Sequence, residues 1–243
     1  MLITMAVYDT EENKRSRYTA ATLNSLAGMV DWSKHRLIVS DNGSIERTHS
    51  YYNDYSDIIE EVIFNGENIG TANALNKAWR MRERWEYVCK IDNDVVIWHK
   101  DWPDEVELVM NRMRNLGILG LKRMDLEEWP LNSNPFYRSE LLPVPHRKGE
   151  PWRVIERVKH VMGTCQTFSP LCLEKIGYLY QPGVYGFDDA LASARAKLAG
   201  LDVAFLIGPN LHHIDEGTTE FTEWKAREAG KKMQSYQSIP VSY

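Results

Sequence analysis

The sequence predicts an α/β protein with a mainly parallel sheet flanked by helices. Short apolar runs rich in β-branched residues recur along its 243 residues, and segments with helical periodicity separate them. Clusters of Asp, Asn and Gly follow several of these runs, at the strand ends where open α/β sheets bind ligands. Because strands that alternate with helices form right-handed crossovers, we expect the runs to lie in one sheet.

The first hundred residues follow this pattern closely. Their expected strands cover residues 2–8, 35–40, 59–64 and 87–97, and their expected helices cover residues 16–28 and 71–84. Later strands are expected over 116–121, 161–168 and 203–207, and later helices over 102–115, 170–176, 186–199 and 219–236. The proline-rich residues 122–157 are expected to form an irregular excursion. We therefore expect one domain, 1–243, with a first half, 1–100, and a second half, 101–243, that carries the excursion.

Composition narrows the class of protein. With 43% hydrophobic and 26% charged residues, the chain can bury a full core. Its net charge of −5 argues against a dedicated nucleic-acid binder but is compatible with a local basic patch. Cys89, Cys165 and Cys172 form no C-x-x-C pair and lie in apolar runs, which fits a reducing cytoplasm. No stretch approaches the roughly eighteen apolar residues of a membrane span, so we expect a soluble, cytoplasmic protein.

The apolar run from Tyr87 to Ile97 contains two carboxylates, Asp92 and Asp94, with only Asn93 between them. Residues i and i+2 of a strand point to the same side, so both carboxylates can converge on one cation. Because a buried, unpaired carboxylate is costly, Mg²⁺ or Mn²⁺ would stabilise the pair and leave room for substrate phosphates. An acidic loop at a strand end is also common without a metal, so the tripeptide alone does not decide between the two readings.

Further segments carry a wider resemblance, which is weakest over residues 122–157. They occur in the order Ala6-Val7-Tyr8, Asp41-Asn42-Gly43-Ser44, Asn68 to Asn76 and Asp92-Asn93-Asp94, each in or after a predicted strand. A fifth element, Asp188-Asp189, is followed eleven residues later by Gly200. This ordered set resembles the GT-A glycosyltransferases, in particular the family 2 type, which are inverting and use nucleotide sugars. The resemblance implies the GT-A fold, in which a Rossmann-like sheet is flanked by helices.

The resemblance also implies a donor site for a nucleotide sugar. Tyr8 and Thr10 would meet the nucleobase and ribose, and Asp41 would accept a hydrogen bond from uracil. In the competing interpretation Tyr8 belongs to the core, Asp41 orders a turn, and the segment from Asn68 is a capped helix start. The implied donor-site residues are Ala6, Tyr8, Thr10, Asp41, Asn42, Asn68, Gly70, Asn73, Asp92 and Asn93.

The same resemblance assigns a metal site and a catalytic base. Asp92 and Asp94 would bind Mn²⁺ or Mg²⁺, with His212 or His213 as a third ligand, although adjacent histidines are also ordinary surface residues. Asp189 matches the base of the family. Asp188 replaces the glutamate of the family and would orient the acceptor or the helix. In the competing interpretation both carboxylates simply cap the helix.

The excursion is the expected source of acceptor contacts. Its aromatic residues Trp129, Phe136, Tyr137 and Trp152 could pack on sugar rings or bases, or could form a small satellite core. From Arg138 to His160 six Arg or Lys stand against three Glu, a mild positive bias that suits an anionic acceptor. A glycan, an anionic polymer or a modified DNA base are all compatible with it. The Q-x-x-R-W signature of processive polymerases is absent from the sequence, which favours transfer of a single sugar.

We therefore expect a metal-dependent, non-processive, hexosyltransferase-type glycosyltransferase that uses a UDP-sugar. One alternative is a nucleotidyltransferase that makes sugar nucleotides. It would carry a Gly-rich basic loop after the first strand, where this chain has Asp9-Thr10-Glu11-Glu12. The other alternative is a non-catalytic carbohydrate-binding domain. It is disfavoured because every acidic position of the pattern is filled.

Overall fold

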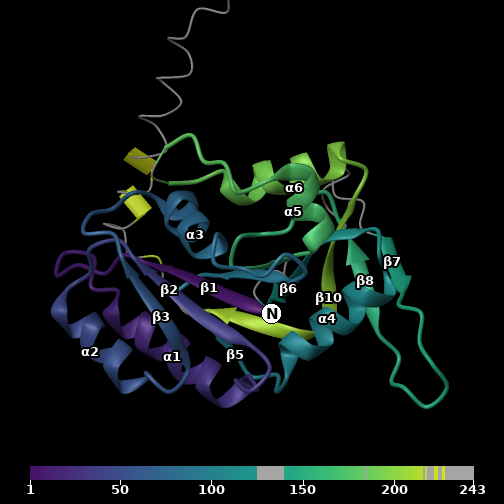
Figure 1. Ribbon diagram of the computed structural model, residues 1–243, viewed down its shortest axis with the longest axis horizontal. Helices are drawn as coiled ribbons and strands as arrows, with labels where there is room; N and C mark the ends of the chain where they lie inside the picture. Colours follow the sequence, from purple (N-terminus) through teal and green to yellow (C-terminus); the bar gives the residue numbers. More distant parts are fainter. Residues whose placement is uncertain (125–139, 184, 216, 218–221, 224–225, 228–243) are drawn as a thin grey trace, which may run out of the picture.

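The computed structural model describes residues 1–124, 140–183, 185–215, 217, 222–223 and 226–227, and one mixed sheet forms the centre of this part of the chain (Figure 1). Its strands are β1 (Leu2–Val7), β2 (Arg36–Asp41), β3 (Ile59–Phe64), β4 (Val88–Ile91), β5 (Val95–Ile97), β6 (Leu116–Arg123), β7 (Glu140–Pro143), β8 (Val154–Arg157), β9 (Cys165–Phe168) and β10 (Asp202–His213). Their order is β3-β2-β1-β4-β9-β6-β10-β8-β7, and β5 pairs with β10 beside this path. Strands β3, β2, β1 and β4 run parallel, whereas β9 lies antiparallel between β4 and β6.

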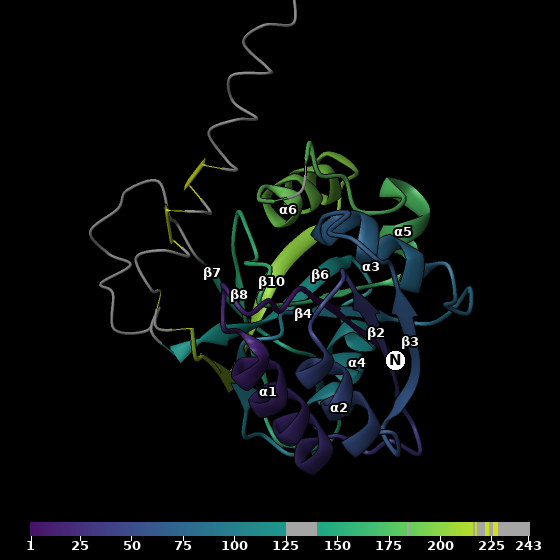
Figure 2. The ribbon, with the colours of Figure 1, turned by 90° about the vertical axis from the view of Figure 1, so that its left-hand side faces the viewer.

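Helices cover both faces of this sheet (Figure 1). They are α1 (Ser16–Met29), α2 (Glu46–Asp54), α3 (Thr71–Trp79), α4 (Trp102–Arg112), α5 (Pro170–Ile176) and α6 (Asp188–Leu198). Helices α1, α2 and α4 share one hydrophobic core with the sheet, and α3, α5 and α6 share a second core on the opposite face (Figure 2). The α/β class expected from the sequence is therefore confirmed.

The first strand shows how the sequence builds the two cores. Ile3 and Met5 of β1 lie in the core with α1, whereas Leu2 lies in the core with α3. This alternation follows from the two-residue period of a strand. Both faces of β1 are buried, so its apolar residues are continuous rather than alternating, as expected for a central parallel strand.

Several expected elements are confirmed and others need correction. Strand β3 and helix α5 cover their expected residues, β1 and α1 differ from expectation by one residue at one end, and β2 is shifted by one residue. The expected helix 71–84 ends at Trp79, and the expected strand 161–168 begins only at Cys165. The strand expected to close the sheet at 203–207 extends to His213 and is not at the edge. The excursion is not wholly irregular, because it forms the antiparallel hairpin of β7 and β8 beyond β10.

The most consequential correction concerns residues 87–97, which do not form one strand. Strand β4 ends at Ile91, the chain turns through Asp92-Asn93-Asp94, and β5 then pairs antiparallel with β10. The turn is held by tertiary hydrogen bonds: the Asn93 amide donates to Asp9 Oδ1 (3.1 Å) and to Thr19 Oγ1 (2.7 Å). The change of direction therefore depends on residues from a distant part of the sequence.

Some expectations fall on residues that the structure does not describe. Trp129, Phe136 and Tyr137 lie outside the described residues, as does most of the helix expected over 219–236. No described helix combines the length and apolar character needed to cross a bilayer.

Candidate active site

A cavity of about 320 Å³ opens at the C-terminal ends of β1 and β4, facing the start of α6. Ten of the residues singled out in the sequence line it: Ala6, Tyr8, Asn42, Asn68, Asp92, Asn93, Asp94, Asp188, Asp189 and His213. Five others do not line it: Thr10, Asp41, Gly70, Asn73 and His212. Segments from the first half and from the second half of the chain thus meet around one space.

The buried carboxylate of Asp9 anchors the turn that carries Asp92 and Asp94. It is fully buried and accepts hydrogen bonds from Thr19 Oγ1 (2.7 Å), Thr48 Oγ1 (3.0 Å) and the Asn93 amide (3.1 Å). Burial raises the pKa of Asp9, and the two threonine hydroxyls oppose that rise. Asn93 therefore points into the fold, which leaves Asp92 and Asp94 on either side of it at the cavity.

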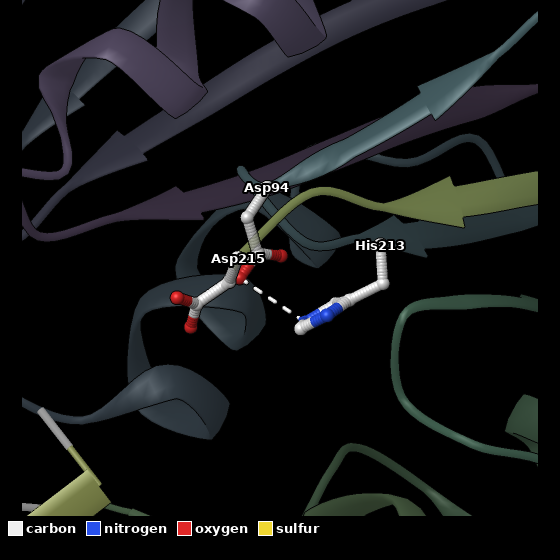
Figure 3. A group of neighbouring side chains, drawn as sticks. All are labelled: Asp94, His213 and Asp215. Atoms are coloured by element: carbon white, nitrogen blue, oxygen red, sulfur yellow. Dashed lines mark ion pairs between the residues drawn. The ribbon is translucent and has the colours of Figure 1, made fainter. Parts of the chain in front are cut away.

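Three neighbouring side chains, two of which line the cavity, form a group that could hold a cation (Figure 3). Asp94, His213 and Asp215 each offer one ligand atom, and these atoms lie within 4.8 Å of one another. His213 Nε2 is 3.3 Å from Asp94 Oδ2, while the other oxygen, Asp94 Oδ1, is buried without a hydrogen-bond partner among the described residues. Two carboxylates and an imidazole suit Mn²⁺. The unpartnered oxygen is a further reason why a divalent cation fits this group.

The same carboxylates pair with a buried arginine. Arg15 stands just before α1, and its guanidinium donates to Asp94 Oδ2 and to Asp215 Oδ2, the latter at 2.8 Å. Burial alone would raise the pKa of Asp94, but the His213 hydrogen bond and the Arg15 charge hold it well below its usual range. Asp94 is therefore ionised and doubly paired.

Asp92 has a different environment. Its side chain is 34% exposed to the cavity, and its Oδ1 lies 3.9 Å from the Lys90 ammonium. The surrounding protein partly desolvates the carboxylate, which raises the pKa of Asp92. The Lys90 charge opposes this rise and the charges of Asp94 and Asp188 add to it, and the resulting pKa is about 6. A carboxylate held among other carboxylates in this way gains most from an added cation.

On the opposite wall, Asp188 is tied to Lys90. The Lys90 ammonium lies 2.5 Å from Asp188 Oδ2, and both side chains are more than nine-tenths buried. A Cβ atom on Gly163 would come within 2.6 Å of Lys90 Nζ, so the glycine leaves the space that the ammonium occupies. Burial would lower the pKa of Lys90, but the Asp188 and Asp92 charges outweigh it and raise that pKa, which keeps the side chain charged.

Asp189 is held by different groups and keeps contact with the cavity. Its Oδ2 accepts from the backbone N–H of Gly163 (2.9 Å), its Oδ1 accepts from the N–H of Ala190 (2.7 Å), and His160 Nε2 lies 3.3 Å away. Burial acts to raise the pKa of Asp189, but the His160 contact and the Lys90 charge lower it to about 2. The carboxylate is thus ionised and oriented at neutral pH.

Asp41 and Thr10, two residues predicted to bind the nucleotide-sugar donor, do not line this cavity. Asp41 is buried, with Oδ1 accepting from the N–H groups of Gly43 and Ser44 and Oδ2 accepting from the Tyr52 hydroxyl at 2.7 Å. These contacts match the turn-ordering interpretation. Thr10 lines a second cavity of about 710 Å³, which shares Tyr8 and Arg15 with the first and is also lined by Asp215.

The remaining predicted residues have local roles. Gly70 precedes α3 with φ of 87°, a conformation that favours glycine, and its N–H donates to Asn68 Oδ1. The Asn73 amide donates to the Ile69 carbonyl of its own helix start. His212 neighbours His213 on β10, so it faces the other side of the strand, where its ring packs at a tilt against Trp98 with the ring centres 4.3 Å apart. Of the two histidines, only His213 reaches the cavity.

Sequence reasoning missed the cavity residues Arg15, Lys90, Arg123 and Tyr185, the neighbouring carboxylate Asp215, and the supporting residues Asp9 and His160. Lys90 carried a signal, because a lysine inside a buried apolar strand needs a carboxylate partner as much as Asp92 needs a cation. Asp215 follows His213 by two residues, a spacing that could have been read as a ligand pair. Arg15 lies in a loop full of charges and carried no such signal.

Comparisons with known proteins concern the family and the fold of this chain. Residues 7–170 match the model of glycosyl transferase family 2. No curated protein matches the sequence. Among solved structures, S. aureus TarS (residues 1–349) superimposes with a TM-score of 0.62 at 17% identity, covering 86% of this chain and 58% of that one. The mannosyltransferase PcManGT from Pyrobaculum calidifontis, solved with GDP-Man and Mn²⁺, gives 0.66 at 14% identity, covering 100% and 65%.

A third structure, GalNAc-T7 with UDP, GalNAc and Mn²⁺, gives a TM-score of 0.63 at 12% identity and covers 88% of this chain and 43% of that one. At such low identities these likenesses establish the fold alone. The chain spans less than two thirds of the length of each of these structures. The family match, in contrast, covers more than half of the sequence. The chain has a GT-A fold and belongs to glycosyl transferase family 2.

Proposed function

We propose that this protein is a metal-dependent, inverting and non-processive glycosyltransferase that moves one sugar from a nucleotide-diphosphate sugar to an acceptor hydroxyl. One observation carries the proposal. Asp94 and His213 belong, with Asp215, to a group that could hold a cation. They line the same cavity as Asp189, an ionised carboxylate at a helix start. An in-line displacement needs both, one beside the leaving diphosphate and one opposite it.

The donor is held, in this proposal, by residues of the first half. Tyr8 offers an aromatic face at the cavity, and Asn42 and Asn68 offer amide groups that can pair with a nucleobase. The structural neighbours hold UDP-GlcNAc, UDP or GDP-Man, so fold alone does not select the base. We favour a UDP-sugar because the resemblance assigns uracil reading to Asp41, which does not itself line the cavity but immediately precedes the cavity residue Asn42.

A divalent cation, Mn²⁺ or Mg²⁺, would be held by Asp94, His213 and Asp215, with Asp92 beside them at the cavity. When bound, it supplies positive charge that neutralises the departing diphosphate. Lys90 keeps its charge because Asp188 and Asp92 surround it. The Tyr185 hydroxyl stays protonated near Asp92 and Asp94, because burial and these charges raise the pKa of Tyr185 to about 12.

The base in this mechanism is Asp189. Its carboxylate is fixed by two backbone N–H groups and accepts the acceptor's hydroxyl proton as the oxygen attacks the anomeric carbon. Asp188 is not available for this role, because its Oδ2 is paired with the Lys90 ammonium at 2.5 Å. The pairing with Lys90 thus assigns different tasks to two adjacent carboxylates.

The second half, 101–243, supplies the acceptor side in this proposal, within a single domain. Arg123 borders the cavity, and the hairpin of β7 and β8 leads to an exposed Trp152 that stacks on His146. A cationic and aromatic rim suits an anionic acceptor, either a glycan or a charged polymer, with a modified DNA base as a third class. A cytoplasmic location suits the buried, reduced cysteines.

Slow donor hydrolysis tests the proposal directly. The protein is incubated with UDP- and GDP-sugars with Mn²⁺ or with EDTA, and the released products are quantified. Metal-dependent release of a nucleoside diphosphate supports a transferase, and its loss in Asp94→Asn ties it to this cavity. Formation of pyrophosphate would instead indicate a nucleotidyltransferase, and no turnover with any donor or metal would indicate a binding domain.

The choice of base is tested by thermal stability. A ligand that binds only the folded state raises the melting temperature according to its affinity. With Mn²⁺ present, we expect UDP to raise the melting temperature more than GDP does at the same concentration. A larger rise with GDP would overturn the preference for uracil while leaving the transferase proposal intact.

A further inference from the structure

Arg15 lies at the junction of two cavities and contacts the group of side chains proposed to bind the metal. Its two terminal nitrogens donate to different carboxylates, one to Asp94 Oδ2 and the other to Asp215 Oδ2. The Arg15 side chain is 7% exposed, and the two carboxylates are 6% and 3% exposed. Arg15 lines both the first and the second cavity, and Asp215 lines the second.

A cation at this group would compete with Arg15. Asp94 and Asp215 are two of the three candidate ligands, and each already gives one oxygen to the guanidinium. A divalent cation and a guanidinium that share carboxylate oxygens a few ångströms apart repel each other strongly in a site with little water. Close contact of both with the same oxygens is therefore unfavourable, and a cation that takes these oxygens displaces Arg15 from them.

The displaced guanidinium would need another anion, because a buried charge without a partner is costly. Lys90 already neutralises Asp188, so Asp188 is not available to it. A donor diphosphate is a suitable partner, since a guanidinium binds phosphate oxygens in a bidentate manner. Because Arg15 borders both cavities, it can turn from the carboxylates without leaving the site.

We propose, on the basis of the proposed function, that Arg15 is a positioning residue that links metal binding to donor binding. Without a metal, it holds Asp94 and Asp215 together and compensates their charge. When the cation binds, Arg15 exchanges these carboxylates for the diphosphate of the nucleotide. The metal alone then binds weakly, because it must displace Arg15, and the nucleotide strengthens metal binding because it gives Arg15 a new partner. Such coupling is reciprocal, so the metal strengthens nucleotide binding by the same factor.

Mn²⁺ affinity tests this proposal without any measurement of activity. Titrations followed by the electron paramagnetic resonance signal of unbound Mn²⁺ give the Kd for the wild type, Arg15→Met and Arg15→Lys, each without nucleotide and with saturating UDP. Arg17→Met serves as the matched control, because Arg17 lines the second cavity two residues away and is not a partner of Asp94. Melting temperatures of all variants are measured in EDTA and in Mn²⁺.

We expect Arg15→Met to bind Mn²⁺ alone about tenfold more tightly than the wild type, a typical size for coupling between two ligands. UDP should tighten Mn²⁺ binding in the wild type and in Arg17→Met but much less in Arg15→Met. Arg15→Met should melt at a lower temperature in EDTA and recover more than the wild type on addition of Mn²⁺. Arg15→Lys, which keeps one charge but not the fork, should lie between the two, and it provides the test if the methionine variant does not fold.

The outcomes separate this inference from the proposed function. If Mn²⁺ affinity without nucleotide is no higher in Arg15→Met and Arg15→Lys than in the wild type, the role of Arg15 is wrong while the metal site stands. If UDP strengthens Mn²⁺ binding equally in the wild type and in the Arg15 variants, the exchange is also wrong. If no variant binds Mn²⁺ with or without UDP, the metal-dependent function itself is overturned.

Discussion

The cavity contains two pairs of carboxylates, Asp92 with Asp94 and Asp188 with Asp189, and the two pairs are built alike. In each pair one side chain is nearly inaccessible and bonded to a buried cation: Asp94 to Arg15, at 6% exposure, and Asp188 to Lys90, at 8%. The other member keeps more exposed surface, 34% for Asp92 and 25% for Asp189. Each pair thus combines an anchored carboxylate with one that remains accessible to a ligand.

The two buried cations differ in their surroundings. Lys90 is enclosed beneath Gly163, where even a methyl group would collide with its ammonium. Arg15 borders two cavities and shares its carboxylates with the proposed metal site. The comparison teaches that the Lys90 pair is a permanent part of the fold, whereas the Arg15 pairs are suited to exchange.

The largest expected effect comes from Asp189, the accessible carboxylate of the pair at the start of α6. Asp189→Asn keeps the shape of the side chain but removes the base, so kcat should fall by about a hundredfold to ten-thousandfold while metal-dependent donor binding persists. Steady-state kinetics and calorimetry with UDP and Mn²⁺ measure the two quantities. The exposed Asp57→Asn is the control. Near wild-type turnover in Asp189→Asn, or a product with the donor's anomeric configuration, would refute the assignment.

Removing the partner of Asp188, the anchored carboxylate at the start of α6, should reduce stability. Lys90→Met leaves Asp188 buried without its cation, and the free energy of unfolding should fall by about 3 kcal/mol, the scale for breaking one side of a buried pair. The double variant Lys90→Met/Asp188→Asn should recover part of that loss, because no uncompensated charge remains. Urea denaturation measures both variants. A double variant no more stable than Lys90→Met would argue against a permanent structural pair.

Replacing Asp94, the anchored carboxylate of the pair after β4, should weaken metal binding. Asp94→Asn removes a proposed ligand, and even residues that only orient ligands contribute tenfold or more to metal affinity. Mn²⁺ affinity in the presence of UDP should therefore fall by at least about tenfold. Asp202→Asn, a paired carboxylate at the start of β10, should retain wild-type affinity. Unchanged Mn²⁺ binding in Asp94→Asn would locate the cation elsewhere.

The smallest effect concerns acid stability. The pKa of Asp189 in the folded protein is about 2, against an ordinary value of 3.8. A group with a lowered folded pKa stabilises the protein above its unfolded pKa, and this contribution is lost as the pH falls from about 4 to about 2. It amounts to about 2 kcal/mol at most, so Asp189→Asn should show a weaker decline of unfolding free energy between pH 5 and pH 3. An identical decline in the two proteins would contradict this origin.

The parts of the fold that the sequence predicts well are those determined by local pattern. Strand β3 and helix α5 are bounded by turn residues and a Ser-Pro cap, so their limits can be read directly. The division of residues 87–97 into β4 and β5 could not be read in this way. It depends on Asp9 and Thr19, which hold Asn93 from a distant part of the chain, and on the pairing of β5 with β10.

The candidate site divides similarly. The carboxylates Asp92, Asp94, Asp188 and Asp189 could be predicted because motif order marks them. Their cations could not, because Arg15 and Lys90 acquire partners only through tertiary contacts. His213 and His212 were indistinguishable in sequence, and only the register of β10 against β5 decides which of them faces the cavity.

The separation in sequence between the paired residues has a consequence for folding. Arg15 and Asp215 are 200 residues apart, and Lys90 and Asp188 are 98 residues apart. Closing such long loops costs chain entropy, so contacts of this kind form late. The proposed cation-binding group is then assembled only when β10 docks beside β5 and β6. Binding of the proposed metal would then follow folding rather than nucleate it, and refolding rates should be the same with Mn²⁺ and with EDTA.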